Sequence, residues 1–190
     1  MIDEIIVVDD GSFDETQAVV KQFNPKVRYL SNMKNKGKAY SMNKGIMDTD
    51  AGVIFFCDAD LVGLTPDTIS QIVRPVKDGN CDMFVGLRDI PSNRLGLCLL
   101  SGQRAIRRRI WDNMPNFCKK GFRVEIGLNS CARSWGTKVF DYDQTAKENK
   151  YGFMQGLYRR FFMGLDLLTA FIYIFWTRKR RQMKNENQII

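Results

Sequence analysis

The sequence lacks histidine entirely across its 190 residues. This absence excludes histidine-based catalytic triads, imidazole metal sites and histidine general bases. Cysteine is present five times, an odd number, and no two cysteines form a Cys-x-x-Cys pair. We therefore expect reduced thiols in a cytosolic protein rather than a disulfide framework. Any chemistry must rely on carboxylates, lysine, arginine, tyrosine or a bound metal ion.

The first residues also lack the pattern of a secretion signal, because residues 1–4 are acidic where such a signal is basic and then apolar. Basic residues outnumber acidic ones, 29 against 21, which gives a net charge of +8. This excess favours an anionic partner, such as a nucleotide diphosphate, an anionic lipid or a nucleic acid. Aromatic residues are not interleaved with the basic clusters, so we expect no specific nucleic-acid partner.

Two carboxylates follow directly on an apolar run at residues 53–60, Val-Ile-Phe-Phe-Cys-Asp-Ala-Asp. The continuous apolar run predicts a strand buried on both faces of a parallel sheet. Ligands bind beyond the carboxyl ends of such strands, which is where Asp58 and Asp60 lie. Their spacing places both on one side of an extended chain, and a hard cation such as Mg²⁺ or Mn²⁺ would offset their repulsion. A solvated turn is the alternative interpretation.

Strand and helix patterns alternate from residue 2 to residue 60. We predict strands at residues 5–8, 27–30 and 53–57, and helices at residues 14–23 and 39–47. This alternation is typical of an α/β fold with a mostly parallel sheet and its ligand loops along one edge. Further along, we predict a helix from about residue 65 to 76, a strand at 83–88 and a short edge strand at 138–142.

The loops at the predicted ligand edge carry charged residues suited to a nucleotide. Asp9 and Asp10 end the first predicted strand and have oxygens that accept hydrogen bonds from a base or ribose. Lys36 and Lys38 come just before a predicted helix start, where main-chain amides and cations both favour an anion such as a diphosphate. An ordinary surface loop is the alternative for the lysines.

Three motifs in this order and spacing resemble glycosyltransferase family 2: IIVVDDGSFDET at residues 5–16, NKGKA at 35–39 and DAD at 58–60. Within that family, the chain is most similar to the dolichol- or polyprenol-phosphate sugar transferases. The resemblance implies a GT-A-like fold, a UDP- or GDP-sugar donor, a Mg²⁺ or Mn²⁺ cofactor and inversion at the anomeric carbon. It also implies that Asp9 or Asp10 holds the base, Lys38 lies near the nucleotide, Asp58 contacts the ribose or metal, and Asp60 ligates the metal.

Two features depart from the family pattern. Val62 stands where polyprenol-phosphate mannose synthases often have a glutamine ligand to the metal. The family also normally begins with a strand, a nucleotide-binding loop and a helix before the segment that starts here at Ile2. We therefore expect an amino-terminally truncated GT-A-like fold. A fragment, a differently completed sheet and a chain without catalysis all remain open.

The middle of the chain contributes candidates for the acceptor side. Arg88 ends a predicted strand and could meet a phosphate or form a surface ion pair. Residues 101–108 resemble a family helix that would carry Arg104 and Arg108 on one face, suited to a lipid phosphate. Glu125 is the candidate acceptor-side carboxylate, acting as a base if the acceptor is a hydroxyl. A capping or salt-bridged role is its alternative.

Apolar residues recur at helical spacing between residues 154 and 177, with basic residues at both ends. We expect membrane-interface helices at residues 151–181 after a catalytic domain at 1–150, and a disordered tail at 182–190. A short membrane span and a helix pair packed on the domain are the alternatives. The expected location is peripheral, on the cytoplasmic face of an anionic membrane.

The sequence thus predicts a metal-dependent inverting glycosyltransferase that moves a sugar to a lipid phosphate or another membrane-linked acceptor. Asp60 and Glu125 are its candidate catalytic residues, and Asp58 and Asp60 its candidate metal ligands. The alternative function is a non-catalytic, truncated glycosyltransferase-like protein bound at the membrane surface.

Overall fold

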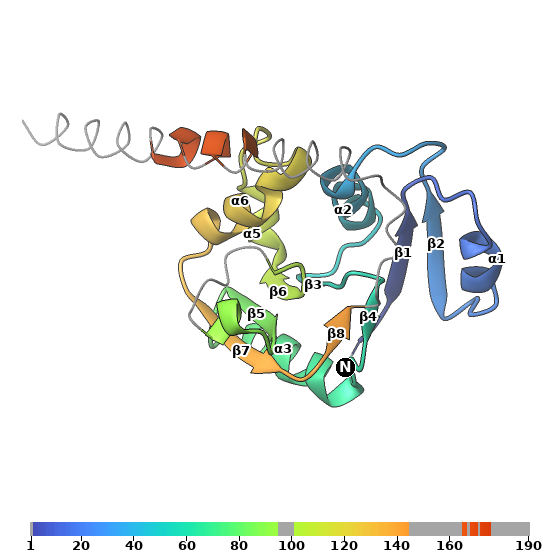
Figure 1. The fold of residues 1–190 in the computed structure, drawn as a ribbon, viewed down its shortest axis with the longest axis horizontal. Coiled ribbons are helices and arrows are strands. Elements are labelled where there is room, and N and C mark those ends of the chain that lie inside the picture. Colours follow the sequence, from blue (N-terminus) through green and yellow to red (C-terminus); the bar gives the residue numbers. More distant parts are fainter. Residues whose placement is uncertain (1, 95–100, 145–164, 167, 171, 176–190) are drawn as a thin grey trace, which may run out of the picture.

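The computed structural model describes residues 2–94, 101–144, 165–166, 168–170 and 172–175 (Figure 1). Its strands are β1 (Ile5–Asp9), β2 (Val27–Ser31), β3 (Val53–Phe56), β4 (Leu61–Val62), β5 (Met83–Arg88), β6 (Arg104–Arg107), β7 (Trp135–Phe140) and β8 (Asp143–Gln144). Its labelled helices are α1 (Thr16–Lys21), α2 (Lys38–Met47), α3 (Pro66–Lys77), α4 (Pro91–Arg94), α5 (Arg108–Asp112) and α6 (Val124–Cys131), with a 3₁₀ turn, η1, at Gly121–Arg123. The predicted alternation of strands and helices up to residue 60 is confirmed.

Within residues 2–94 and 101–144, the strands form three hydrogen-bonded sheets. A four-stranded sheet has the order β3-β6-β5-β7, and among these described strands β1 pairs with β2 and β4 with β8. The β1–β2 and β5–β7 pairs are parallel, but β6 runs antiparallel to both of its neighbours, as β4 does to β8. The α/β class is therefore confirmed. The predicted mostly parallel sheet is confirmed in part, because β3, β5 and β7 of the four-stranded sheet run in one direction and β6 runs opposite to them.

The antiparallel strand β6 comes from a segment predicted to be a helix. Arg104 and Ala105 are buried in this strand, and β6 lies between β3 and β5. Burial between two neighbouring strands outweighs a helical pattern whose intrinsic preference is weak. Arg104 and Arg108 consequently do not share a helix face, because Arg108 begins the following helix, α5.

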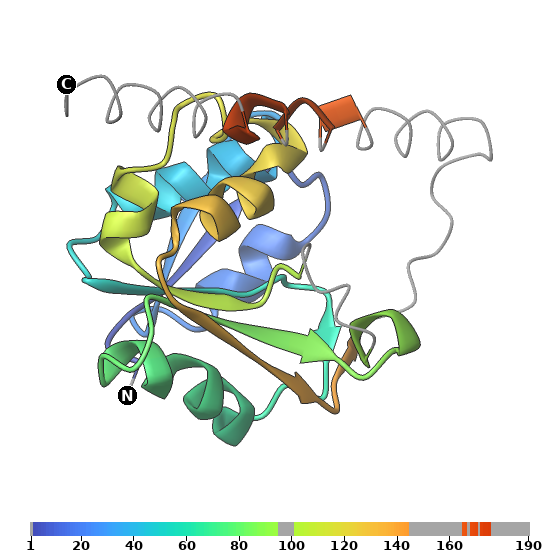
Figure 2. The ribbon, with the colours of Figure 1, turned by 90° about the vertical axis from the view of Figure 1, so that its left-hand side faces the viewer.

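Helices cover both faces of the four-stranded sheet (Figure 2). On one face, Met83, Val85 and Leu87 of β5 join a core cluster with residues of α2, α5 and α6. On the other face, Phe84 packs with a second cluster that includes α3. This alternation along β5 follows from the two-residue repeat of a strand. The helix α3 begins as its sequence predicts, since the Thr65 hydroxyl accepts from the Thr68 amide at 3.1 Å.

The strand β3 is less buried than its apolar sequence predicts. All four of its residues are only half-buried. The physical reason is that one edge of β3 pairs with β6, while the other edge faces a cavity of about 530 Å³ that it shares with β1. Both faces of β3 are covered, since Ile54 and Phe56 pack against one core cluster and Val53 and Phe55 against the other. The predicted burial on both faces is therefore confirmed only in part.

The described carboxyl-terminal residues 165–166, 168–170 and 172–175 are helical and lie against the α/β unit. The Arg123 guanidinium pairs with Asp166 at 3.1 Å, and the rings of Phe117 and Tyr173 lie 4.6 Å apart. Among the described residues, no helix is long and apolar enough to cross a bilayer. The predicted tail at 182–190 and most of the predicted interface segment at 151–181 lie outside the described residues.

Candidate functional site

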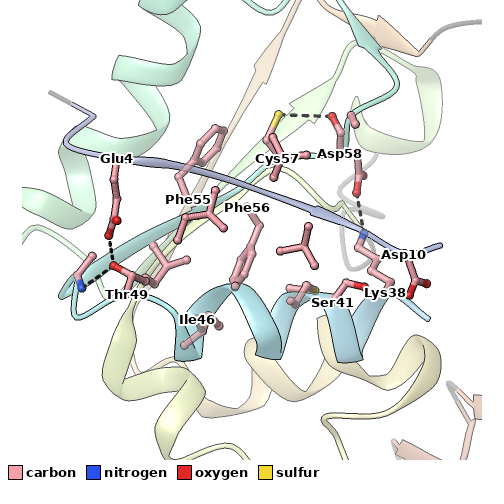
Figure 3. Close-up of a pocket in the computed structure, with 18 of the residues that line it drawn as sticks. Glu4, Asp10, Lys38, Ser41, Ile46, Thr49, Phe55, Phe56, Cys57 and Asp58 are labelled. Carbon is pink, nitrogen blue, oxygen red and sulfur yellow. Dashed lines mark hydrogen bonds and ion pairs between the residues drawn. The ribbon is translucent and has the colours of Figure 1, made fainter. Parts of the chain in front are cut away.

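An ion-paired cluster lies where one strand ends and two helices begin. The Lys38 ammonium stands 3.0 Å from a carboxylate oxygen of Asp58 and 3.2 Å from one of Glu125. Lys38 is the first residue of α2, Asp58 follows β3, and Glu125 is in the first turn of α6. Figure 3 shows Lys38 and Asp58 facing each other at one end of the cavity, beside Asp10. We call Lys38, Asp58 and Glu125 the charged cluster.

Asp10 fixes the turn from which Lys38 projects. Its two carboxylate oxygens accept hydrogen bonds from the main-chain amides of Lys36, at 2.8 Å, and Gly37, at 2.7 Å. Gly37 has a φ of 90°, a left-handed conformation that glycine adopts without steric cost. In the structure the Asp10 carboxylate binds the chain's own amides, and its contact with a nucleotide stays a prediction.

Asp9 is held in the same manner by neutral donors. Its carboxylate accepts from the Tyr29 hydroxyl at 2.5 Å and from the Ser12 amide at 2.8 Å. Burial by itself would raise the pKa of Asp9, but these hydrogen bonds outweigh it and hold the pKa below 3.8. The pKa of Asp10 is lowered on the same terms, with burial opposed by the amides of Lys36 and Gly37 and by Asn32. Both side chains are therefore ionised at neutral pH.

Attraction between opposite charges stabilises the charged cluster. Burial would lower the pKa of Lys38, but the negative charges of Glu125 and Asp58 outweigh it and raise the pKa above 10.5. Glu125 is buried, whereas 38% of the Lys38 side chain is exposed, and a buried carboxylate is tolerated when it is paired. The structure thus holds one positive charge between two acids.

Two residues of the site were not predicted from the sequence. The Gln103 amide donates to the second carboxylate oxygen of Asp58 at 2.8 Å. Gly102 lies directly against the same carboxylate, because a Cβ at this position would collide with Asp58 and stand 2.9 Å from the Lys38 ammonium. Both residues lie in the segment 101–108, whose resemblance to a family helix predicts a role on the acceptor side instead.

Gln103 is in turn positioned by two hydroxyl groups. The Tyr142 hydroxyl lies 2.9 Å from the Gly86 carbonyl oxygen and 3.2 Å from the Gln103 side-chain oxygen. The Ser101 hydroxyl likewise lies 2.7 Å from the Gly86 carbonyl oxygen and 3.2 Å from the Gln103 side-chain oxygen. Burial raises the pKa of Tyr142 to about 12, so the hydroxyl keeps its proton. These contacts fix the amide that donates to Asp58.

Asp60 lies near Asp58 but is not among the residues that line the cavity. Partial burial, with added repulsion from Asp58 and Asp60, raises the pKa of the Cys57 thiol to about 11. The carboxylates of Asp58 and Asp60 are therefore both close enough to Cys57 to disfavour its thiolate. Within the described part of the chain, no three histidine, cysteine, aspartate or glutamate side chains are grouped closely enough to hold a metal unaided.

The candidate arginines lie outside the charged cluster. The Arg104 side chain is buried and donates to the Ser101 carbonyl at 2.9 Å and to the Asn129 side chain at 2.9 Å. These hydrogen bonds link β6, which contains Arg104, to α6, which contains Asn129. Arg88, at the end of β5, pairs with Asp143 at 2.9 Å. The surface ion pair was one of the two interpretations of Arg88 that the sequence left open.

Comparisons with known proteins agree with this architecture. The family model described as "Glycosyl transferase family 2" matches residues 1–138. Glucosyl-3-phosphoglycerate synthase from Petrotoga mobilis is 32% identical over 175 residues, covering 73% of this chain and 53% of that protein. Human dolichyl-phosphate beta-glucosyltransferase is 38% identical over 69 residues, covering 34% of this chain and 21% of that protein. The chain thus spans about half the length of the first of these relatives and about a fifth of the length of the second.

A solved structure shares the fold. Glucosyl-3-phosphoglycerate synthase from Mycobacterium tuberculosis, in complex with Mn²⁺, UDP-glucose and phosphoglyceric acid, superposes with a TM-score of 0.69 at 20% identity. The match covers 89% of this chain and 69% of that one. Fold and site together define an α/β protein of the GT-A-like class, with acidic residues gathered at the ends of its strands. With more than half of its length matched by the family model, the chain belongs to glycosyl transferase family 2.

Proposed function

We propose that this chain is the catalytic part of a metal-dependent inverting glycosyltransferase that moves a sugar from a UDP- or GDP-sugar to a lipid phosphate or another membrane-linked acceptor. The observation that carries the proposal is the charged cluster, in which Asp58 and Glu125 enclose the Lys38 ammonium beside Asp10. The carboxylates of such a cluster suit a metal ion, and its ammonium suits the diphosphate of a nucleotide sugar. The names of the relatives, which include a dolichyl-phosphate glucosyltransferase, support the class of reaction and the acceptor.

The donor set fits Mg²⁺ or Mn²⁺. Asp58 and Asp60 supply hard carboxylate oxygens from one turn, and such ions typically take one or two carboxylates together with substrate phosphates. The ammonium of Lys38 already shows that the site accommodates positive charge next to Asp58. When bound, the metal would supply Lewis-acid stabilisation of the departing nucleoside diphosphate.

The chain's own residues have distinct tasks in this proposal. Lys38 binds the diphosphate, since its ammonium is mobile enough to leave an acid for a phosphate. Asp9 contacts the base or ribose, while Asp10 holds the turn from which Lys38 projects. Glu125 faces the acceptor and removes its proton if the acceptor is a hydroxyl, whereas a lipid phosphate is already ionised and needs no base. Arg88, released from Asp143, is the candidate contact for the acceptor phosphate.

Membrane association at the cytoplasmic face is the location that we propose. Leu165, Leu168, Ile172 and Phe175 are all exposed in the carboxyl-terminal helical residues and recur at helical spacing. Asp166, Ala170 and Tyr173 lie on the side that contacts the α/β unit. The outer side is thus an apolar stripe suited to an anionic membrane interface. In this proposal residues 1–150 are the catalytic domain, 151–181 the membrane-associating segment and 182–190 the tail.

Calorimetry with and without Mn²⁺ tests the function. UDP-glucose and GDP-mannose are titrated into the chain, and we expect heat from one donor only when Mn²⁺ is present. The Asp60→Asn variant should lose metal-dependent binding and sugar transfer while keeping its unfolding temperature. Unchanged transfer in that variant would remove Asp60 from the mechanism, and no heat with either donor would favour the non-catalytic, membrane-bound alternative.

Sedimentation with vesicles tests the membrane proposal separately. Vesicles that contain phosphatidylserine should capture the chain, and the double variant Leu168→Ser and Ile172→Ser should be captured several-fold less. The matched variant Val62→Ser also removes an exposed apolar residue, but from β4, and should be captured normally. Equal capture of all three proteins would rule out the apolar stripe as the contact.

A further inference from the structure

The carboxylate of Asp58, a proposed metal ligand, is held in part by a segment far away in sequence. The Gln103 amide nitrogen donates to this carboxylate at 2.8 Å. The oxygen of the same amide lies 3.2 Å from the hydroxyl of Tyr142, a residue just beyond β7. Both Gln103 and Tyr142 are buried. A chain of hydrogen bonds therefore leads from the Tyr142 hydroxyl to Asp58.

Two hydroxyl groups share two acceptors in this chain of hydrogen bonds. The Tyr142 hydroxyl lies 2.9 Å from the Gly86 carbonyl oxygen, and the Ser101 hydroxyl lies 2.7 Å from it. Both hydroxyls also lie 3.2 Å from the Gln103 side-chain oxygen. Each hydroxyl carries one proton. Both acceptors are therefore satisfied only when one hydroxyl donates to each.

This sharing decides which end of the Gln103 amide faces Asp58. The oxygen of an amide side chain only accepts hydrogen bonds, and its nitrogen only donates them. With a hydroxyl proton directed at its oxygen, Gln103 presents its nitrogen to the carboxylate. Without the Tyr142 hydroxyl, the single proton of Ser101 serves two acceptors. The amide is then free to turn its oxygen toward Asp58, where two negatively polarised groups repel each other.

The chain that follows Tyr142 also holds the other end of the same turn. The short strand β8 pairs with β4, and Gln144 lies opposite Leu61. Leu61 directly follows Asp60, the second proposed metal ligand. One segment thus reaches Asp58 through side chains and the residue after Asp60 through the main chain.

We propose that Tyr142 is a positioning residue that sets the affinity of the Asp58–Asp60 turn for Mg²⁺ or Mn²⁺, because its hydroxyl fixes the Gln103 amide against Asp58. This inference rests on the proposed function, in which Asp58 ligates the metal. Loss of a group that hydrogen-bonds to a metal ligand typically weakens metal binding about 10- to 100-fold. Tyr142 acts through one further group, so we expect a loss of about 10-fold.

Electron paramagnetic resonance of Mn²⁺ tests the inference, since the free ion gives a sharp signal that binding broadens. Mn²⁺ is titrated into the full chain with UDP and, separately, with GDP. Tyr142→Phe should bind Mn²⁺ about 10-fold more weakly than the parent chain. The matched variant Tyr173→Phe also removes a hydroxyl, from the carboxyl-terminal helical residues, and should bind Mn²⁺ as the parent does.

A double-mutant cycle tests the route through Gln103. Gln103→Met has a side chain of similar length without the donor, and it should weaken Mn²⁺ binding about 10- to 100-fold. Adding Tyr142→Phe to this variant should cause no further loss, because the group on which Tyr142 acts is already gone. Losses that add in the double variant would overturn the inference.

Thermal unfolding separates positioning from a merely structural role. A structural role of Tyr142 would lower the unfolding temperature of Tyr142→Phe and leave its Mn²⁺ affinity unchanged, which would overturn this inference alone. Failure of the proposed function gives a different result. A parent chain that binds no Mn²⁺ with either nucleotide would remove the metal from the turn, and the inference with it.

Discussion

Two turns of this molecule have similar sequence patterns but different electrostatic surroundings. Asp9-Asp10 and Asp58-Ala59-Asp60 both follow a short apolar strand. The first pair is held by neutral donors, namely main-chain amides and the hydroxyl of Tyr29. Asp58 is held by a cation, Lys38, and by the Gln103 amide. The comparison indicates that the first turn holds neighbouring main-chain groups in place, whereas the second is the turn at which our proposal places the metal and the diphosphate.

The largest effect should come from removing the charge at the second turn. We expect Asp58→Asn to lower sugar transfer by about 100-fold or more, since loss of groups around a metal typically costs 10- to 100-fold even beyond its direct ligands. Initial rates across a Mn²⁺ titration measure the effect. A matched change at the first turn, Asp10→Asn, should keep the Mn²⁺ dependence. Equal loss of that dependence in both variants would contradict the division of roles.

A smaller effect should come from crowding the second turn without changing its charge. In Gly102→Ala, the added methyl group meets the ends of the Asp58 and Lys38 side chains, which can shift while the backbone stays. We expect transfer to fall about 10- to 100-fold, because displacements of about 1 Å in a catalytic site cost up to that much. Thermal unfolding should change little.

The matched control is Gly52→Ala, because Gly52 has open space where its Cβ would be. It should leave transfer unchanged. If both alanine variants behave alike, the closeness of Gly102 to the charged cluster has no consequence.

At the first turn the main effect should be on stability. Asp10→Asn replaces an oxygen that accepts an amide hydrogen bond by a donor, which should cost about 1–3 kcal/mol of unfolding free energy. Urea unfolding followed by circular dichroism measures it. The exposed Asp3→Asn serves as control and should be neutral. A neutral Asp10→Asn would show that the turn at Lys36 and Gly37 needs no carboxylate.

The smallest effect should appear in the pH dependence of that stability. The pKa of Asp10 is lower in the folded chain than its ordinary 3.8, so its contribution is complete above that value and declines as pH falls through the lowered pKa. The stability difference between the parent chain and Asp10→Asn should hence be constant from pH 5 to 7 and shrink below about pH 4. A difference that grows on acidification would reverse the assigned sign.

The sequence predicted much of the first 60 residues because local signals and the fold agree there. The strands and helices predicted from apolar patterns agree with the structure, and acids follow β1 and β3 as the sequence shows. It failed at β6, where Arg104 is buried, because its placement depends on strands far away in sequence. Gln103 was missed for the same reason: its link to Asp58 spans 45 positions. The half-burial of β3 was also unpredictable, since it results from which edges are paired.

The ammonium between Asp58 and Glu125 means that this polypeptide carries its own counter-ion. The two acids need no metal to coexist, so we expect the chain to fold in a chelator-treated solution. Metal uptake is then a swap of one cation for another, and a diphosphate that draws Lys38 toward itself lowers the cost of that swap. Ion and nucleotide should consequently bind with positive cooperativity, each raising the other's affinity by the same factor.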